Sequence, residues 1–269
     1  DLGGGEDMKN IATVARRYAQ SLAACVYFFG GGVLRSKHRA LLCTLCEHFG
    51  FEKSLAPAAT IPRVRPDSLC REPIEVSLAR LESSPGNVSF LELALIDYFV
   101  RRAAPRICFE IGTFDGRTTL NLAVNSPPDA RVFTLDLPSS WTSATALRID
   151  RTDEEWIEKK ASGAKFAGTP YESKITRRYG DSATFDFSPY VGAVDLVFVD
   201  GAHSYEYVKQ DSATALRLLR GGHGVILWHD YNFARYPGVT MLLNELREND
   251  ERCRAMRHIE GTMLCYLEL

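Results

Sequence analysis

The chain has 269 residues, of which 45% are hydrophobic and 25% are charged. This mixture is usual for a globular protein and excludes wholesale disorder, collagen-like repeats and a disulfide-dense miniprotein. With 32 basic against 34 acidic residues, the net charge is -2. Such a balance gives no reason to expect nucleic acid or an anionic membrane as the main partner.

The N-terminal part of the chain predicts two helices, over residues 9–29 and 34–50, which Gly30, Gly31 and Gly32 separate. Prolines then recur through residues 51–75, which predicts an extended connector. The apolar run over residues 22–29 is shorter than the roughly 20 residues that a membrane span needs. We therefore expect residues 1–74 to be a helical segment with a connector, without a membrane anchor, and residues 75–269 to form the main domain.

The seven cysteines are odd in number and irregularly spaced. This pattern favours reduced thiols and a cytoplasmic location. Cys43, Cys46 and His48 have a metal-like spacing, but no second pair completes the four ligands of a zinc site. Buried cysteines on a helix are the better interpretation of this pair.

Residues 88–103 carry an apolar face at helical period, and short apolar runs alternate with helical stretches after them. The predicted strands cover residues 107–111, 132–135, 175–179, 194–199 and 225–228, with two more within 256–267; the helices cover 117–124, 153–162, 204–220 and 238–248. Continuous apolar strands alternating with helices are typical of a doubly wound, mostly parallel α/β sheet. The last two strands predict an antiparallel C-terminal hairpin that closes the edge of a seven-stranded sheet.

Ligands of such sheets bind at the carboxyl ends of the strands, where this chain has several polar motifs. The first predicted strand ends in a Glu110-x-Gly112-x-x-x-Gly116 turn before a helix, whose N-terminus offers free N–H groups to an anion. The turn is neither Gly-x-Gly-x-x-Gly nor a P-loop. A strand–turn–helix without a ligand is the alternative interpretation.

The next two strand ends favour an adenosine ligand. Asp136 follows the second strand and could accept both hydroxyls of a ribose, as in binding sites for NAD or S-adenosylmethionine. Asp181 and Ser182 follow the third strand and could bond the adenine edge. Helix N-caps are the alternative for all three residues.

The fourth and fifth strand ends hold Asp200, His203, His229 and Asp230. Asp200, His229 and Asp230 could converge as ligands of a divalent metal. His203 has the side chain of a general base for a hydroxyl group. A helix cap for Asp200 and a hydrogen-bonded histidine for His229 remain the alternatives.

These motifs together resemble the class I S-adenosylmethionine-dependent methyltransferases over about residues 75–269. Within that class the chain is similar to the small-molecule O-methyltransferases, both the catechol type and a bacterial group with a Val-Asp-Gly-x-His-x-Tyr stretch, here Val199 to Tyr205. The resemblance implies a Rossmann-like fold and assigns cofactor binding as follows. The methionine part would lie on Glu110, Gly112, Thr113, Gly116 and Thr118, the ribose on Asp136, the adenine side on Asp181 and Ser182, with Asp200 also beside the cofactor.

The chain departs from the catechol type at two positions. That type has a lysine base where this chain has His203, and an Asp-Asn pair where this chain has His229 and Asp230. A histidine is an unusual ligand for Mg²⁺, so the identity of the metal, Mg²⁺ or another divalent ion, stays open. Residues 139–170, with Trp141 and Trp156, are expected to cover the pocket.

The sequence thus predicts transfer of a methyl group from S-adenosylmethionine to a hydroxyl of a small-molecule acceptor, with His203 and Asp200 as catalytic residues. We expect no nucleic-acid or membrane partner, and a homo-oligomer stays open. Two alternatives remain. A nicotinamide-dependent oxidoreductase would use Gly112, Gly116 and Asp136, and a non-catalytic scaffold would use residues 9–50 for oligomerisation or for contact with a membrane surface.

Overall fold

The computed structural model describes residues 4–31, 34–35, 38, 57–82, 84–138, 140, 145–150, 152–153, 156 and 162–269, with side chains from residue 13 onward. The chain divides into two compact units, residues 1–55 and residues 56–269. Part of the predicted connector belongs to the second unit, because Ile61 and Leu69 are buried in its core. The domain boundary after residue 74 stays a prediction.

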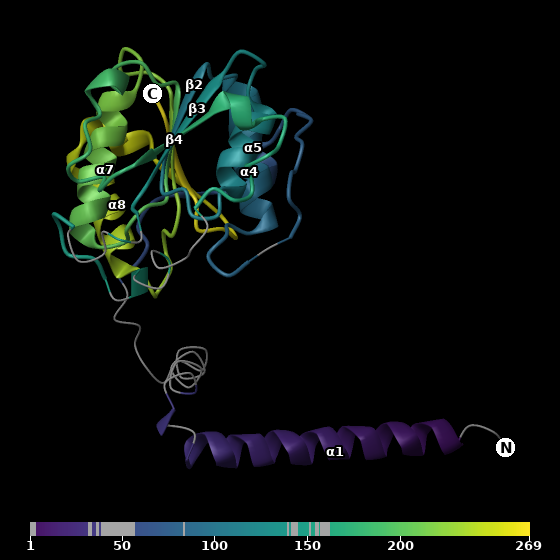
Figure 1. Cartoon of the computed structure of the whole chain (residues 1–269). Helices are drawn as coiled ribbons and strands as arrows, with labels where there is room; N and C mark the ends of the chain where they lie inside the picture. Colours follow the sequence, from purple (N-terminus) through teal and green to yellow (C-terminus); the bar gives the residue numbers. More distant parts are fainter. Residues whose placement is uncertain are drawn as a thin grey trace. The chain divides into compact units, whose positions relative to one another are not determined.

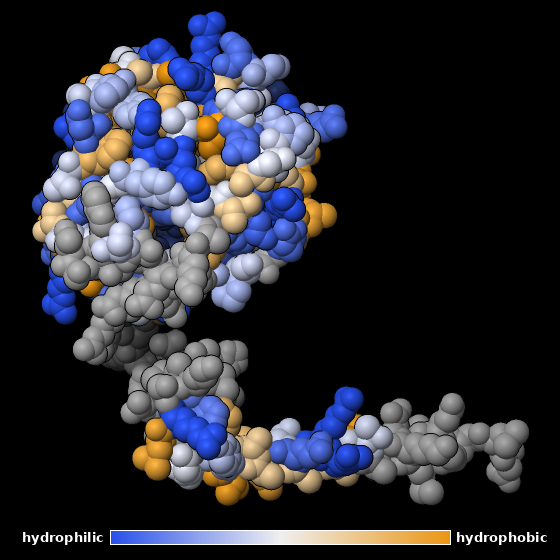
Figure 2. Space-filling view, viewed as in Figure 1, coloured by the Kyte–Doolittle hydropathy of each residue, from blue (hydrophilic) through white to orange (hydrophobic). Residues whose placement is uncertain are grey.

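Helix α1 (Gly4–Phe29) dominates the described part of the first unit and confirms the helix predicted over residues 9–29. Figure 2 shows hydrophobic surface along this helix. Its exposed large side chains include Val14, Tyr18, Leu22, Val26 and Phe29. Among the residues that the structure describes, no helix is both long and apolar enough to cross a bilayer. The helix predicted over 34–50, with Cys43, Cys46 and His48, lies outside the described residues, apart from residues 34, 35 and 38.

The second unit is built on one mixed sheet of eight strands in the order β1-β7-β8-β6-β5-β2-β3-β4. The strands are β1 (Arg63–Val64), β2 (Ile107–Ile111), β3 (Arg131–Asp136), β4 (Ile175–Tyr179), β5 (Leu196–Val199), β6 (Val225–Trp228), β7 (Arg257–Ile259) and β8 (Cys265–Glu268). Only β8 is antiparallel to its neighbours, β6 and β7. The Rossmann-like, mostly parallel sheet with an antiparallel C-terminal hairpin is therefore confirmed.

The hairpin does not close the sheet edge, and this detail of the prediction is wrong. Strand β1, from the expected connector, adds an eighth strand in parallel to β7. The backbone N–H of His258 donates to the carbonyl of Pro62 at 3.0 Å, and that of Glu260 to the carbonyl of Val64 at 2.9 Å. The connector can do this because an extended segment leaves its carbonyls free to accept.

Helices α4 (Phe90–Ala103) and α5 (Arg117–Asn125) cover one face of the sheet, and α7 (Tyr205–Leu218) and α8 (Pro237–Asn249) cover the other (Figure 1). The shorter helices are α3 (Pro66–Leu69), η3 (Glu172–Lys174), η4 (Ser188–Tyr190) and η5 (Glu251–Ala255). The four helices predicted over 88–103, 117–124, 204–220 and 238–248 are thus confirmed. The one predicted over 153–162 lies mostly outside the described residues.

The two faces of the sheet bury alternate residues of the same strands. Phe109 and Ile111 of β2 belong to one hydrophobic cluster, whereas Cys108 between them belongs to the other. The same alternation divides Trp228 from Leu227 in β6. Because side chains alternate along a strand and both faces are covered, the positions of β2 and β6 are apolar except for the buried Glu110. Most polar groups follow these strands at their carboxyl ends, where the site lies.

Candidate active site

A cavity of about 1100 Å³ opens at the carboxyl ends of the parallel strands. Eight of the predicted site residues line it: Gly112, Asp136, Asp181, Ser182, Asp200, His203, His229 and Asp230. Of the described residues, Glu110, Thr113, Gly116 and Thr118 are predicted site residues that do not line it. The topology thus brings together the aspartates and histidines of four strand ends beside Gly112 of the first turn, while the other predicted residues of that turn lie outside the cavity lining.

Gly112 is required where the ends of β2 and β5 meet. Its backbone is left-handed, with φ of +98°, and a Cβ atom there would lie 2.0 Å from the carbonyl oxygen of Asp200. A side chain of any size would therefore push the two strand ends apart. Gly112 thereby keeps Asp200 beside the first turn.

Glu110 supports the first turn from inside the protein. Its side chain is fully buried, and Oε2 accepts hydrogen bonds from the hydroxyls of Thr119 and, at 2.6 Å, Thr134. Burial raises the pKa of Glu110 to about 8, and the two hydroxyls only partly offset this effect. The carboxyl group is therefore mainly protonated at neutral pH, and it connects α5 to β3 instead of facing the cavity.

Thr113, Gly116 and Thr118 also take supporting places. The Thr113 hydroxyl lies 2.6 Å from that of Thr134, in the same buried network. Gly116 caps α5 with φ of +83°, and a Cβ atom there would lie 2.6 Å from the ring of Phe166. Thr118 is half-buried on the first turn of α5. The turn therefore packs closely under residues 163–166.

Asp136 ends β3 on the wall of the cavity. Burial raises its pKa, and hydrogen bonds from the backbone N–H groups of Thr113, Leu137 and Phe114 oppose that rise. A carboxylate at this place can accept hydrogen bonds from ligand hydroxyls, which is the role that the sequence predicted for it.

Asp181 uses both carboxylate oxygens within the protein. Oδ2 accepts from the backbone N–H of Ala146 at 2.7 Å. Oδ1 accepts from the N–H of Ala183 at 2.9 Å and from the hydroxyl of Tyr207 at 3.0 Å. Asp181 therefore ties residues 145–150 to the cavity wall, beside Ser182.

His203 is clamped between two carboxylates. Its Nδ1 lies 2.6 Å from Oδ1 of Asp153, and its Nε2 lies 2.7 Å from Oδ2 of Asp230. Its ring stacks on that of Tyr236, with 3.7 Å between centroids, and Tyr236 accepts a hydrogen bond from Nε1 of Trp156 at 2.8 Å. Burial lowers the pKa of His203, but the hydrogen bonds to Asp153 and Asp230 outweigh burial and raise the pKa to about 10.

His229 and Asp230 follow β6 and face the same group of carboxylates. Nδ1 of His229 lies 3.1 Å from Oδ1 of Asp200 and 3.3 Å from Oδ2 of Asp230. Burial lowers the pKa of His229, but Asp230 and Asp200 raise it well above its usual range. Asp230 has a left-handed backbone with φ of 62°, which is uncommon outside glycine and is often found at functional sites.

Three of these residues could hold a metal ion, and the set differs from the predicted one in a single member. Asp200, His203 and Asp230 offer ligand atoms that all lie within 4.8 Å of one another. The sequence had placed His229 in this group instead of His203. Because His203 begins the turn into α7, its ring reaches back over the strand ends, whereas the second nitrogen of His229 faces away, toward Glu92.

Asp153 and Glu92 belong to this cluster and were missed at the level of sequence. Asp153 lies within the segment that was expected to cover the pocket, where Trp156 also lines the cavity, while Trp141 lies outside the described residues. The Ser-x-x-Glu pattern ending at Glu92 is a capping-box signal, and the structure has that box. Neither local pattern says which histidine its carboxylate would meet.

Comparison with known proteins gives one family and a set of similar folds. A family model described as a methyltransferase domain matches residues 109–231 of this chain. No curated protein matches the chain. One similar solved structure is that of the O-methyltransferase TomG from Streptomyces achromogenes, which is involved in tomaymycin synthesis and was solved in complex with SAM. It is 20% identical to this chain, and the match covers 68% of this chain and 81% of that chain at a TM-score of 0.45. An O-methyltransferase from Bacillus cereus in complex with SAH is 18% identical, with 69% and 84% covered at a TM-score of 0.45.

Proposed function

We propose that this chain, whose residues 109–231 match the methyltransferase domain family, transfers a methyl group from S-adenosylmethionine to a hydroxyl oxygen of a small-molecule acceptor. One observation carries the proposal. His203 stands on the wall of the same cavity as Gly112 and Asp136, with its ring held between Asp153 and Asp230. A base and a cofactor-binding edge in one cavity suit removal of a proton from an acceptor beside the methyl donor.

The cofactor side of the cavity would lie over β2, β3 and β4. S-adenosylmethionine supplies a sulfonium methyl group, which an acceptor oxygen can attack in line. The Gly112 turn would lie against its methionine part, and the carboxylate of Asp136 would accept from the ribose hydroxyls. Ser182 and Asp181 would lie at the adenine side. Because Asp181 already has three donors, its expected contribution is to hold residues 145–150 over that side.

His203 would act as the general base in its neutral form. Because Asp153 and Asp230 raise its pKa to about 10, the imidazole must first release to solvent the proton that Nε2 shares with Asp230. A proton can then be accepted only at Nε2, because Asp153 holds Nδ1 at 2.6 Å. An acceptor hydroxyl must therefore replace the contact of Nε2 with Asp230. Once the proton has moved, Asp153 stabilises the imidazolium, as the orienting carboxylate does in other histidine-based sites. Asp200, at the mouth of the same cluster, would orient the acceptor.

Metal assistance is a further part of the proposal. Two carboxylates and an imidazole within 4.8 Å of one another are a suitable donor set for a divalent cation. The imidazole favours a transition metal such as Mn²⁺ or Zn²⁺ over Mg²⁺, which prefers oxygen ligands. A cation there would make the acceptor hydroxyl more acidic. It would take the place of the proton on Nε2 of His203, so metal assistance is the alternative to base catalysis by that nitrogen.

Calorimetric titration with S-adenosylhomocysteine tests the cofactor part of the proposal, and titration with NADH is the control. Micromolar binding of S-adenosylhomocysteine is expected, and repeats with EDTA or added Mn²⁺ test coupling to the cluster. Incubation with S-adenosylmethionine and a panel of phenols, catechols and sugars then tests the acceptor class by NMR of the product. Methyl groups found only on nitrogen would contradict O-methylation, and a folded sample that binds no S-adenosylhomocysteine would favour the scaffold alternative.

The partners and the location of the protein also belong to the proposal. We propose a small-molecule acceptor as the only partner class, with no nucleic acid or membrane, and a cytoplasmic location for the reduced thiols. Each described cysteine is free, with Cys108, Cys253 and Cys265 buried. A homo-oligomer formed through the exposed face of α1 is tested by deleting residues 1–50, because an unchanged size by light scattering would contradict it.

A further inference from the structure

Glu92 is a buried glutamate outside the part of the chain that matches the family. It lies on the first turn of α4, and only 2% of its surface is exposed. Glu92 is not among the described residues that line the cavity. No ligand in the cavity would therefore meet this side chain directly, and its burial calls for another explanation.

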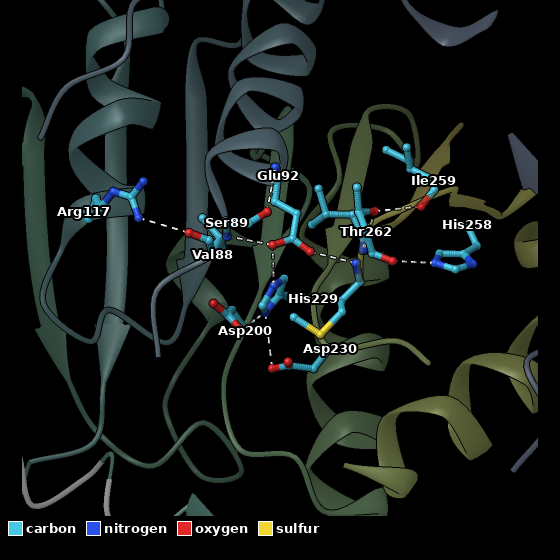
Figure 3. Close-up of polar contacts among 12 residues, drawn as sticks. Val88, Ser89, Glu92, Arg117, Asp200, His229, Asp230, His258, Ile259 and Thr262 are labelled. Carbon is cyan, nitrogen blue, oxygen red and sulfur yellow. Dashed lines mark hydrogen bonds and ion pairs between the residues drawn. The ribbon is translucent and has the colours of Figure 1, made fainter. Parts of the chain in front are cut away.

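Both oxygens of Glu92 are held by backbone groups, as Figure 3 shows. Oε2 accepts from the N–H of Ser89 at 2.7 Å, and Oε1 accepts from the N–H of Met263 at 2.7 Å. The first bond belongs to the capping box of α4. The second joins the helix to the segment between β7 and β8, which a capping box does not require. The carboxylate is thus fixed in position from two sides.

The fixed carboxylate faces the imidazole of His229. Oε2 lies 3.5 Å from Nε2, while Nδ1 on the opposite side of the ring faces Asp200 at 3.1 Å and Asp230 at 3.3 Å (Figure 3). A carboxylate can only accept, so each ring nitrogen presents a hydrogen to the carboxylate that it faces, Nε2 to Glu92 and Nδ1 to Asp200 and Asp230. Burial opposes ionisation of Glu92, yet its contacts with His229 and the two N–H groups lower its pKa to about 2.

We propose that Glu92 is a positioning residue of the active site, which holds the Nε2 side of the His229 ring and thereby directs Nδ1 at Asp200 and Asp230. The role in turnover rests on the function proposed above; the orientation of the ring does not. Carboxylates behind a histidine commonly fix its ring orientation and the nitrogen that it presents to a site. The carboxylates of Asp200 and Asp230 then lie in one arrangement, beside His203.

The test uses the full chain and two matched variants. Glu92→Gln keeps the size of the side chain but removes the charge that faces His229. Ser89→Ala removes the capping hydroxyl, which accepts from the N–H of Glu92 at 3.3 Å, and leaves the carboxylate in place. Nitrogen-detected NMR of histidine-labelled protein, assigned with His229→Gln, reports which ring nitrogen carries hydrogen. The same variants are assayed for methyl transfer with the acceptor found above.

In the wild-type protein Nε2 of His229 should carry hydrogen, and Glu92→Gln should change its resonance. The kcat of Glu92→Gln should fall about tenfold or more, the usual effect of losing such a partner, with affinity for S-adenosylhomocysteine unchanged. Ser89→Ala should lower the melting temperature but keep the wild-type resonance and kcat. A bare Nε2 in the wild-type protein, or equal losses of kcat in both variants, would overturn the proposal. Since the NMR experiment needs no acceptor, failure of the O-methylation proposal would be seen separately.

Discussion

Two glutamates near this site are both almost fully buried, and yet their pKa values are shifted in opposite directions. Glu110, under the first turn, has hydroxyl neighbours, and burial raises its pKa to about 8. Glu92, behind the fifth parallel strand end, faces an imidazole, and its pKa is lowered to about 2. Burial opposes ionisation at both places, so the difference lies in the partner. The proposed cofactor side therefore rests on a mainly neutral framework, whereas the proposed acceptor side is a cluster of charges.

The largest effect is expected from His203→Gln, which removes an imidazole from the charged side. Turnover should fall by about 100-fold or more, since that is the usual contribution of a general base. Affinity for S-adenosylhomocysteine should hardly change, because Asp136 and the Gly112 turn are untouched. Steady-state kinetics and calorimetry measure the two quantities, with thermal unfolding as the control for folding. Unchanged turnover would remove His203 from the role of base.

Asp136→Asn should have the reverse effect, on binding more than on turnover at saturation. Losing a charged acceptor for two ribose hydroxyls should weaken binding of S-adenosylhomocysteine about tenfold or more. Thr118→Ala is the matched control, since Thr118 does not line the cavity. Calorimetry should give the control nearly wild-type affinity. If Thr118→Ala weakens binding as much as Asp136→Asn does, the cofactor reaches further along α5 than the cavity indicates.

Glu110→Gln should change how the free energy of unfolding depends on pH, which tests the raised pKa of Glu110. The folded-state pKa of about 8 is raised above the ordinary value of 4.5, so the folded protein holds a proton that the unfolded chain has lost between these pH values. This contribution to stability is complete below pH 4.5 and is lost as pH rises to about 8, by up to about 1.4 kcal/mol per pH unit. Urea unfolding at several pH values should show a flatter dependence for Glu110→Gln. An unchanged slope would mean that Glu110 is ionised in the folded protein.

Tyr207→Phe should have the smallest effect. It removes one of the three donors to Asp181, and the other two remain on the backbone. The free energy of unfolding should fall by about 1 kcal/mol, and cofactor affinity should change little. Urea unfolding and calorimetry check both values. A large loss of affinity would instead show that Asp181 needs all three donors to keep residues 145–150 over the cavity.

Much of the framework could be predicted because it depends on local patterns. The apolar runs of β2, β5 and β6 predict strands because both of their faces are buried. Polar residues directly after those strands meet at one edge whatever the details of packing. Gly112, Asp136, Asp200 and His203 could therefore be placed in one cavity from the sequence.

The sequence by itself thus determined the sheet, its hairpin and the residues of the strand ends, because period and turn chemistry are local properties of the chain. Only the tertiary structure decided which carboxylate meets which imidazole. Asp153 reaches His203 from the segment after β3, and Glu92 reaches His229 from a helix far earlier in the chain. The addition of β1 to β7 was decided in the same way. Such pairings depend on how helices and loops pack against the sheet, and no periodic pattern records which distant side chains that packing brings within 4 Å.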